Sequence, residues 1–542
     1  MTSPHQPAYR PDIDGLRAVA VIAVVLFHGF PEIIRGGFIG VDIFFVISGY
    51  LISSILIKEH NTGKFTYKSF YTRRIRRIFP ALIFLMSILF AINWFFLFPD
   101  ELVQFGKHVI SGGLFSANLM FWSEAGYFDQ DSGQKMLLHL WSLGIEEQFY
   151  IFWPILLGLL WKRRWVATGV AVFIVFSFIT NIILIHFSQT AAFYFPFSRF
   201  WELLVGSLLA WQQLRYPSSL QRHTHLQSIA GALLITAGLF FITEKSLFPG
   251  YWAMLPVIGS ILLINAGPQA AINRWILSPK AMVWFGLISY PLYLWHWPVM
   301  AFIRLAKNDT LSHAYAWRAI VISVLLAWLT YRFVESPLRK NPSAAWKTKA
   351  LIVAMACIII IGGITIIMEG FPHRKAATSA NPVLLAQIQQ HKEIYKQQDQ
   401  CISAMKVSAS DAENIICLST SPAPKIAIIG DSHSTSFQIA ALLHHETFDS
   451  VSLAQNACLP FANFTTRLPT ENSTTKKCRE STRIALETLA NKPEISTVIL
   501  VNRGSLYFTG SGFGIEGKID FRLYDANEQD PEEHTSELQS LR

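Results

Sequence analysis

Long runs of apolar residues, separated by short polar loops, fill the first 370 or so positions of the chain. Several runs reach the ~20 residues that a helix needs to cross a bilayer. The pattern predicts about 11 spanning helices, near residues 15–30, 38–57, 79–98, 148–161, 166–187, 198–211, 228–242, 251–266, 282–303, 316–334 and 350–368. The apolar stretch 106–122 is predicted not to span, because it contains Ser111, Gly112, Gly113 and Asn118.

Positively charged loops indicate the topology. With a cytoplasmic N-terminus, the Lys- and Arg-rich loops 58–77, 162–164 and 339–349 fall on the cytoplasmic side, where such loops are enriched. No cleaved signal peptide is expected, because Asp12, Asp14 and Arg17 precede the first apolar run. The pattern therefore predicts a multi-pass protein whose residues after about 370 are extracytoplasmic.

The pattern changes after the last apolar run. Residues 374–422 are polar and predict a linker or partly helical stalk. Next come a short strand at 425–429, helices near 437–444 and 481–489, and a strand at 497–501. This alternation is typical of an α/β domain with a parallel sheet.

Composition agrees with a membrane protein, since 52% of the residues are hydrophobic and only 15% are charged. The positive-inside loops account for the net charge of +9, so no nucleic-acid partner is expected. In the polar C-terminal part, chain order favours pairing Cys401 with Cys417 and Cys458 with Cys478, although four free thiols are the alternative in a reducing compartment. No Cys or His spacing indicates a metal site.

Two polar residues in the first predicted span are candidates for chemistry. Arg17 and His28 are eleven positions apart, which places them on one helix face about 16 Å apart along the axis. Such side chains are costly in lipid and are expected to face the bundle interior or a cavity. The alternatives are an interfacial anchor for Arg17 and a satisfied interior histidine for His28.

Seven stretches in the first 340 residues together resemble the acyltransferase-3 family of bacterial O-acyltransferases. They are Arg17 to His28, Gly40 to Tyr50, Phe70 to Pro80, His139 to Tyr150, Ser198 to Glu202, Ser289 to Pro298 and Tyr331 to Glu335. The resemblance implies transfer of an acyl group, usually acetyl from acetyl-CoA, to a carbohydrate hydroxyl of O-antigen, peptidoglycan or exopolysaccharide. It also implies a location in the bacterial inner membrane.

The same resemblance implies that His28 is catalytic, with Arg17 on the same helix face. A neutral imidazole takes the proton from a sugar hydroxyl or accepts the acyl group itself, and the sequence leaves both routes open. The resemblance further implies coenzyme A binding, through its phosphates, by the cluster Arg73, Arg74, Arg76 and Arg77. The alternative for this cluster is an ordinary positive-inside loop.

Further polar and aromatic residues are weaker candidates. His139, Glu146 and Glu147 are expected at the outer mouth of a span, where they could orient the acceptor sugar or tune His28. For Trp141, Trp295 and Trp297, an interfacial aromatic belt is favoured over sugar stacking. Arg199 and Glu202, three positions apart, are expected to neutralise one another.

Gly430-Asp431-Ser432-His433 follows the first soluble strand and resembles the first block of SGNH hydrolases. The resemblance implies that Ser432 is a nucleophile, with Asp431 beside it in the motif. The family's D-x-x-H block is not found, because Asp530 and His534 have the wrong spacing. Asn502 and Arg503 are the nearest match to G-x-N-D, and His433 and His444 are other possible bases.

The expected organisation is an α-helical membrane bundle followed by an α/β SGNH-like three-layer domain. Its parts are 1–340 as the acyltransferase-3 domain, 341–373 as an additional spanning helix, 374–422 as linker, 423–529 as an incomplete SGNH-like domain, and 530–542 as a non-native tail resembling a translated sequencing adaptor.

The favoured function is acyl transfer from cytoplasmic acetyl-CoA past His28, with Ser432 receiving the acetyl group or passing it to the sugar. The expected partners are acetyl-CoA, a carbohydrate and the lipid bilayer, without a metal. A transporter or flippase is one alternative, because intramembrane Arg and His also suit proton coupling. An outward-facing esterase with a membrane anchor is the other.

Overall fold

The computed structural model describes fifteen segments of the chain. These are residues 9–125, 135–162, 165–216, 223–243, 246–306, 312–339, 345–374, 397–408, 411, 415–443, 449–455, 458, 464–467, 473–501 and 522–525. The chain divides into two compact units, Met1–Ala377 and Thr378–Arg542. Each unit is described here by itself.

The first unit is built from helices joined by short loops. The helices are α1 (Pro11–Gly29), η1 (Gly37–Ile39), α2 (Gly40–Asn61), α3 (Tyr67–Phe96), α4 (Pro99–Gly113), α5 (Ala117–Glu124), α6 (Leu140–Lys162), α7 (Val166–Phe187), α8 (Gln189–Tyr194), α9 (Pro196–Arg215), α10 (Thr224–Phe241), α11 (Met254–Ala266), η3 (Asn273–Leu277), α12 (Lys280–Leu287), α13 (Ser289–Ala306), α14 (His313–Leu329), η4 (Thr330–Glu335), α15 (Ser336–Arg339) and α16 (Ala345–Ile367).

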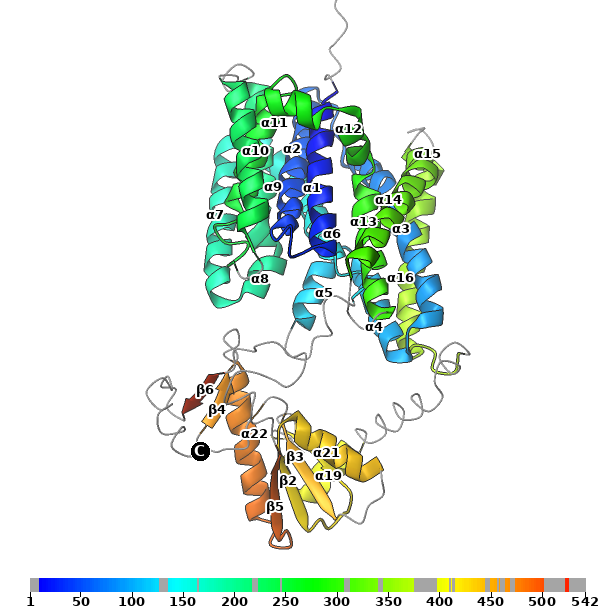
Figure 1. Cartoon of the computed structure of the whole chain (residues 1–542), viewed down its shortest axis with the longest axis vertical. Helices are drawn as coiled ribbons and strands as arrows, with labels where there is room; N and C mark the ends of the chain where they lie inside the picture. The colour runs from blue at the N-terminus through cyan, green and yellow to red at the C-terminus, as the bar shows by residue number, and fades with distance from the viewer. Residues whose placement is uncertain are drawn as a thin grey trace, which may run out of the picture. The chain divides into compact units, whose positions relative to one another are not determined.

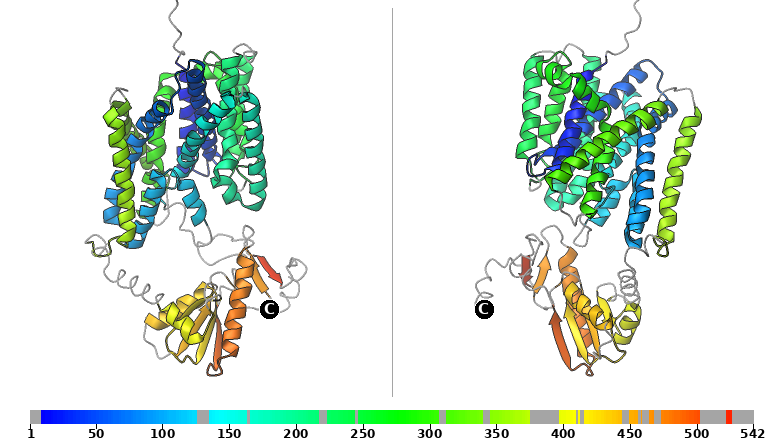
Figure 2. Two further views of the ribbon diagram at one scale, coloured as in Figure 1. Left: turned by 180° about the vertical axis from the view of Figure 1, so that it is seen from behind. Right: turned by 45° about the vertical axis from the view of Figure 1, so that its right-hand side comes forward.

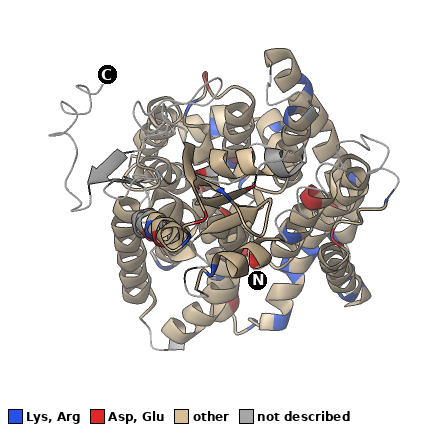
Figure 3. Ribbon diagram, turned by 90° about the horizontal axis from the view of Figure 1, so that it is seen from below, with Lys and Arg blue, Asp and Glu red and all other residues tan. Residues whose placement is uncertain are grey.

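Helices α1 and α2 lie in the centre of this bundle (Figure 1). Helices α7, α9, α10 and α11 group on one side of them, and α3, α13, α14 and α16 on the other, as both views of Figure 2 show. Few charged residues are present along the helices (Figure 3). The central position of α1 and α2 buries three of the polar residues that they carry, Asp12, Asp42 and Ser53.

Seven of the described helical segments are long and apolar enough to cross a membrane, and they coincide with seven of the predicted runs. The seven are Gly37–Asn61, Tyr67–Phe96, Leu140–Trp161, Val166–Phe187, Thr224–Phe241, His313–Arg339 and Ala345–Ile367. The other four predicted runs are also helical, as α1, α9, α11 and the pair α12 and α13. Helix α11 has only 13 residues, and α1 and α9 carry several charged side chains.

The apolar stretch 106–122, predicted not to span, lies outside these seven segments. It belongs to two short helices, α4 with 15 residues and α5 with 8. The turn between them contains Phe115 with a φ of 56°. Neither helix is long enough to span a bilayer alone.

Helices α2 and α9 approach one another closely because each has a glycine at the contact. A Cβ on Gly49 would lie 1.8 Å from the Leu203 carbonyl oxygen, and one on Gly206 would lie 2.2 Å from that of Val46. Small residues allow such close backbone approach between membrane helices. The close packing also brings Asp42 of α2 next to Arg199 of α9.

The second unit contains a mixed four-stranded sheet with the order β1-β3-β2-β5. Its elements, in chain order, are α19 (Gln398–Met405), β1 (Ile416–Ser419), β2 (Ile426–Gly430), α21 (Ser432–Leu443), β3 (Ser450–Ala454), β4 (Phe464–Arg467), α22 (Ser473–Ala490), β5 (Thr497–Val501) and β6 (Arg522–Asp525). Strand β2 pairs in parallel with β3 and β5, and β1 is antiparallel to β3. The predicted α/β fold is therefore confirmed, with parallel pairing for β2, β3 and β5, whereas β1 makes the sheet mixed.

Helices cover both faces of this sheet. Helices α19 and α22 contribute Met405 and Ile484 to a core with Ala427 and Val451, whereas Ile439 of α21 packs on the opposite face against Leu418. The arrangement is three layers (Figure 1).

Two disulfides tie the second unit together, Cys401–Cys417 and Cys458–Cys478, which is the pairing favoured by chain order. The first disulfide joins α19 to β1, and both elements lie inside 374–422. The range predicted as a linker or partly helical stalk therefore includes a helix and a strand of the second unit. Strand β1 has an apolar sequence but only 4 residues, and its pairing with β3 and the disulfide fix it in the sheet.

Candidate functional site

The first unit contains two neighbouring pockets. The larger, called here the His28 pocket, has a volume of about 590 Å³. It is lined by Val24, Phe27, His28, Pro31, Phe38, Val41, Asp42, Leu138, His139, Trp141, Gln189, Phe193, Tyr194, Arg199, Phe248, Tyr293, Trp297 and Arg304. Aromatic walls with a few convergent polar groups are typical of binding sites.

His28 lies in the last turn of α1, at one end of this pocket. Its Nδ1 is 3.1 Å from Nε2 of His296 on α13. The Trp297 ring stands edge-on to the His28 imidazole, with 4.7 Å between ring centroids, and the Arg304 guanidinium donates to the His28 carbonyl oxygen. Helix α13 therefore supplies three residues that fix His28.

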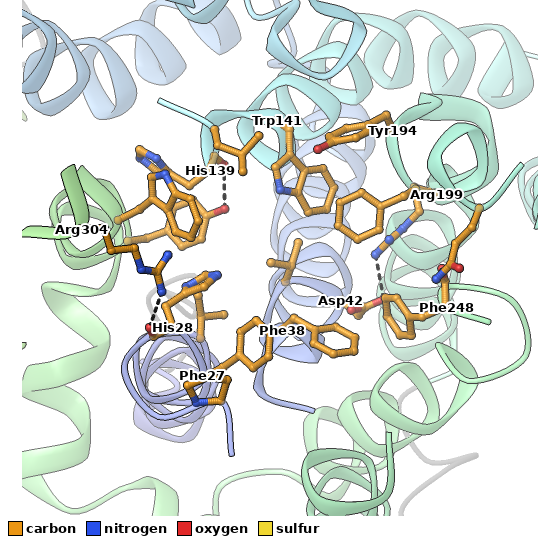
Figure 4. Close-up of a pocket in the computed structure, with 18 residues that line it drawn as sticks. Phe27, His28, Phe38, Asp42, His139, Trp141, Tyr194, Arg199, Phe248 and Arg304 are labelled. Carbon is orange, nitrogen blue, oxygen red and sulfur yellow. Dashed lines mark hydrogen bonds and ion pairs between the residues drawn. The ribbon is translucent and has the colours of Figure 1, made fainter. Parts of the chain in front are cut away.

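His139 precedes α6 and lies near the same end of the pocket (Figure 4). Its ring centroid is 6.0 Å from that of His296, and its carbonyl oxygen accepts a hydrogen bond from the Tyr293 hydroxyl at 2.8 Å. Three histidines from three parts of the sequence thus meet around one wall of the pocket.

Arg199 and Asp42 lie at the opposite end of the pocket from His28 (Figure 4). The Arg199 guanidinium donates to Asp42 at 2.8 Å and is 2.7 Å from Glu202, and all three side chains are 0% exposed. Four aromatic rings surround the guanidinium at 5.5–5.8 Å, those of Phe45, Trp141, Phe193 and Phe248. The predicted neutralisation of Arg199 by Glu202 is confirmed, and Asp42 is a second partner that the sequence did not indicate.

The second pocket, called the Arg17 pocket, has a volume of about 90 Å³. Its charged residues are Arg17, Arg74, Arg77, Glu146 and Glu147. Arg17 is held by Asp14 at 3.2 Å, and Arg74 lies over the Tyr150 ring at 5.5 Å.

Val41 and Tyr293 line both pockets, which are therefore adjacent. Arg17 is near the start of α1 and His28 near its end, so one helix contributes a residue to each pocket. The cationic pocket and the histidine pocket are therefore neighbours with a shared wall, and together they form the candidate site.

The predicted arginine cluster is divided by the helix periodicity of α3. Arg74 and Arg77 face the Arg17 pocket. Arg73 instead pairs with Glu59 at 2.7 Å, and Arg76 donates to Thr348 at 2.8 Å. Arg17 joins Arg74 and Arg77, a grouping that the sequence did not indicate.

The expected grouping of His139 with Glu146 and Glu147 is not found. His139 lines the His28 pocket, whereas both glutamates line the Arg17 pocket, because α6 runs past both. Glu146 accepts hydrogen bonds from Ser48 and Tyr150.

The aromatic-belt interpretation was wrong for all three tryptophans, which are at most 8% exposed. Trp141 and Trp297 line the His28 pocket, and Trp295 donates to Thr330 inside the bundle. His296 was missed as a functional candidate, although an apolar helix with a histidine at its centre is a signal for a polar interior site.

In the second unit, Asp431 and Ser432 lie where the central strand β2 ends and α21 begins. The chain passes from β2 to β3 on one side and later to β5 on the other, so this point is a topological switch, where α/β sheets bind ligands. Asp431 is 1% exposed and accepts from the His433 backbone N–H at 2.8 Å. The carboxylate therefore shapes the turn that presents Ser432.

Several predicted residues lie outside the described part of the chain. They are His444, Asn502, Arg503, Asp530, His534 and the tail 530–542, together with the side chain of Ser432. In the segments that the structure describes, no three His, Cys, Asp or Glu side chains gather as a metal site.

Comparison with known proteins identifies both units. An acyltransferase domain model matches residues 10–332, and a model of the SGNH domain fused to such domains matches residues 400–542. The chain belongs to this acyltransferase family. No solved structure matches it.

Two named relatives are similar to this chain over more than three fifths of its length. O-acetyltransferase OatA of Staphylococcus aureus (strain NCTC 8325 / PS 47) is 32% identical over 355 residues, which cover 62% of this chain and 58% of OatA. YrhL of Bacillus subtilis (strain 168), provisionally named a peptidoglycan O-acetyltransferase, is 32% identical over 395 residues, covering 67% of this chain and 62% of YrhL. The similarity thus spans about three fifths of each relative.

Proposed function

We propose that this acyltransferase moves an acetyl group from cytoplasmic acetyl-CoA to a hydroxyl of extracytoplasmic carbohydrate in the bacterial inner membrane. The observation that carries the proposal is the adjacency of the cationic Arg17 pocket and the His28 pocket through Val41 and Tyr293. The names of OatA and YrhL, which refer to O-acetyl transfer, support it. The N-terminus is proposed to be cytoplasmic and the SGNH-like unit extracytoplasmic.

Arg17, Arg74 and Arg77 are proposed to bind the phosphates of coenzyme A. Guanidinium groups suit phosphate oxygens because they donate two parallel hydrogen bonds. Glu146 and Glu147 oppose these cations in the same pocket and limit its net positive charge. The donor would therefore enter from the Arg17 side, with its thioester directed toward Tyr293.

His28 is proposed to perform the transfer. In the base route, the acceptor hydroxyl attacks the thioester carbonyl carbon while the His28 imidazole takes the hydroxyl proton. The carbon–sulfur bond breaks, and the departing sulfur takes the proton from His28, which gives an ester and free coenzyme A. In the covalent route, the imidazole attacks the thioester carbonyl carbon, the carbon–sulfur bond breaks and coenzyme A leaves as the thiol with the imidazole proton. The acceptor hydroxyl then attacks the acetyl-imidazole, and its proton passes to the imidazole as the carbon–nitrogen bond breaks.

Ser432 is proposed as a second nucleophile, which receives the acetyl group or passes it to the sugar. It is the first residue of α21, directly after the central strand, where helix N–H groups stabilise an oxyanion. If Ser432→Ala retained full carbohydrate acetylation while His28→Ala abolished it, Ser432 would have no part in the transfer.

The test of the function is the O-acetyl content of surface polysaccharide from cells that express the full chain. His28→Ala should abolish the gain in ester, measured by mass spectrometry. His186→Ala is the matched control, because His186 is exposed on α7 and lies outside both pockets. Equal acetylation by the parent and His28→Ala would contradict the proposal, and transport without ester formation would favour a transporter.

A further inference from the structure

We propose that His296 is a positioning residue that sets the tautomer of His28 and makes Nε2 of His28 the reacting nitrogen. This inference rests on the proposed function, because it specifies which atom acts in the same pocket. It starts from the contact between Nδ1 of His28 and Nε2 of His296, which are 3.1 Å apart. Two neutral ring nitrogens can form a hydrogen bond only if one carries a proton and the other does not.

The surroundings of His296 decide which nitrogen carries the proton. Its Nδ1 is 2.7 Å from the Tyr293 carbonyl oxygen and 3.2 Å from that of Leu292. Carbonyl oxygens only accept hydrogen bonds, so Nδ1 of His296 must be the N–H donor. A neutral imidazole has a single N–H, and Nε2 of His296 is consequently an acceptor.

The proton position in His28 then follows. Its Nδ1 must donate to His296, so the lone pair of His28 is on Nε2. Nε2 has no hydrogen-bond partner among the residues that the structure describes, and His28 lines the pocket. The nitrogen that can take a proton or accept an acetyl group is thus the one left open to substrate.

Both rings are held against reorientation. His296 is 0% exposed within α13. The edge-on Trp297 ring packs against His28, and the Arg304 guanidinium anchors the His28 carbonyl oxygen at 3.1 Å. Because the two histidines are 268 positions apart, their contact also fixes the end of α1 against α13.

The chain of hydrogen bonds ends on backbone carbonyl oxygens rather than on a carboxylate. In the described residues no Asp or Glu is hydrogen-bonded to either imidazole, and the charged or titratable groups nearby are Arg304, His139 and Tyr293, whose ring centroid is 5.4 Å from that of His296. The carbonyl groups orient the rings without supplying a full negative charge. The function of His296 is therefore to select a tautomer and not to neutralise an imidazolium.

The first test is kinetic and uses the full chain in lipid nanodiscs with acetyl-CoA and a soluble carbohydrate acceptor, measuring release of free coenzyme A. His296→Phe keeps a planar ring but cannot accept a hydrogen bond, and should lower kcat about 100-fold with little change in KM. His296→Gln offers an amide oxygen to Nδ1 of His28 and should retain activity within about 10-fold of the parent. His186→Phe is the matched control for loss of a histidine outside the pocket.

The second test reports the tautomer directly and does not depend on turnover. Solid-state nitrogen-15 spectra of histidine-labelled protein, with His28→Ala to assign the signals, should show the His28 proton on Nδ1 in the parent and in His296→Gln. A proton on Nε2 in the parent overturns the inference, as does full kcat in His296→Phe. If the parent protein releases no coenzyme A that depends on His28, the proposed function is contradicted instead. The spectrum does not depend on turnover, so it distinguishes a failure of the proposed function from a failure of the tautomer assignment.

Discussion

Replacing Arg199 tests whether the buried cluster of Asp42, Arg199 and Glu202 holds α2 against α9. Arg199→Met leaves two carboxylates, both 0% exposed, without their cation. Removing one partner of a buried ion pair costs about 3–5 kcal/mol, because the remaining charge is uncompensated. We expect a loss of that size in the free energy of unfolding.

The compensating variant separates lost charge balance from lost packing. Arg199→Met combined with Asp42→Asn and Glu202→Gln removes all three charges, and replacing a whole buried ion pair is often close to neutral, within about 1 kcal/mol. The triple variant should therefore be more stable than Arg199→Met alone. Arg215→Met, at an exposed position of α9, should change stability by no more than about 0.5 kcal/mol.

The assay is denaturant unfolding of the full chain in mixed micelles, followed by tryptophan fluorescence. All 16 tryptophans precede residue 347, so the signal reports the membrane unit alone. If Arg199→Met and the triple variant were equally destabilised, the cost would come from packing and the electrostatic reasoning would be refuted. No destabilisation in either variant would refute the importance of the cluster.

Three further outcomes are expected. Cys401→Ala with Cys417→Ala opens a loop of 16 residues and should lower the stability of the second unit by about 3 kcal/mol, which limited proteolysis of the full chain would detect as faster cleavage. Burial raises the pKa of Glu124, but hydrogen bonds from His108 and Lys135 outweigh it and lower that pKa below 4.5. The charged Glu124 carboxylate therefore stabilises the fold above pH 4.5, and this stabilisation is lost as the pH falls through the lowered pKa. On acidification, the melting temperature should drop less for Glu124→Gln than for the parent protein. Arg74→Ala should raise the KM for acetyl-CoA about 10-fold in the coenzyme A release assay, whereas Lys68→Ala, exposed on the same helix, should leave it unchanged.

Sequence periodicity was sufficient to locate the helices, because long apolar runs have few alternatives to a buried or lipid-facing helix. It was insufficient for β3, since Ser450 and Ser452 give that strand a polar sequence. Ser450 is nevertheless 0% exposed, because its hydroxyl donates to Gln438. A local pattern does not reveal a polar group whose partner is on another element.

The same limit applies to the candidate site. His28 could be singled out from its own helix, but His296 depends on a contact across 268 positions and Asp42 on one across 157. Asp42 and His296 both lie in stretches that resemble the acyltransferase-3 family. The residues next to them in the sequence nevertheless give no indication of their roles. Their roles follow from the packing of α2 on α9 and of α1 beside α13.

The wall shared by the two pockets, formed by Val41 and Tyr293, has an electrical consequence in the proposed topology. A membrane voltage falls mainly across regions that exclude water, and such a region would be reduced to the side chains between the pockets if each pocket opened to water on its own side. Moving one charge through the full voltage involves about 2.3 kcal/mol per 100 mV. With acetyl-CoA as the proposed donor, a neutral acetyl group would cross this wall without electrical work, whereas anionic coenzyme A would not, so the voltage would help to determine which part of the donor stays behind.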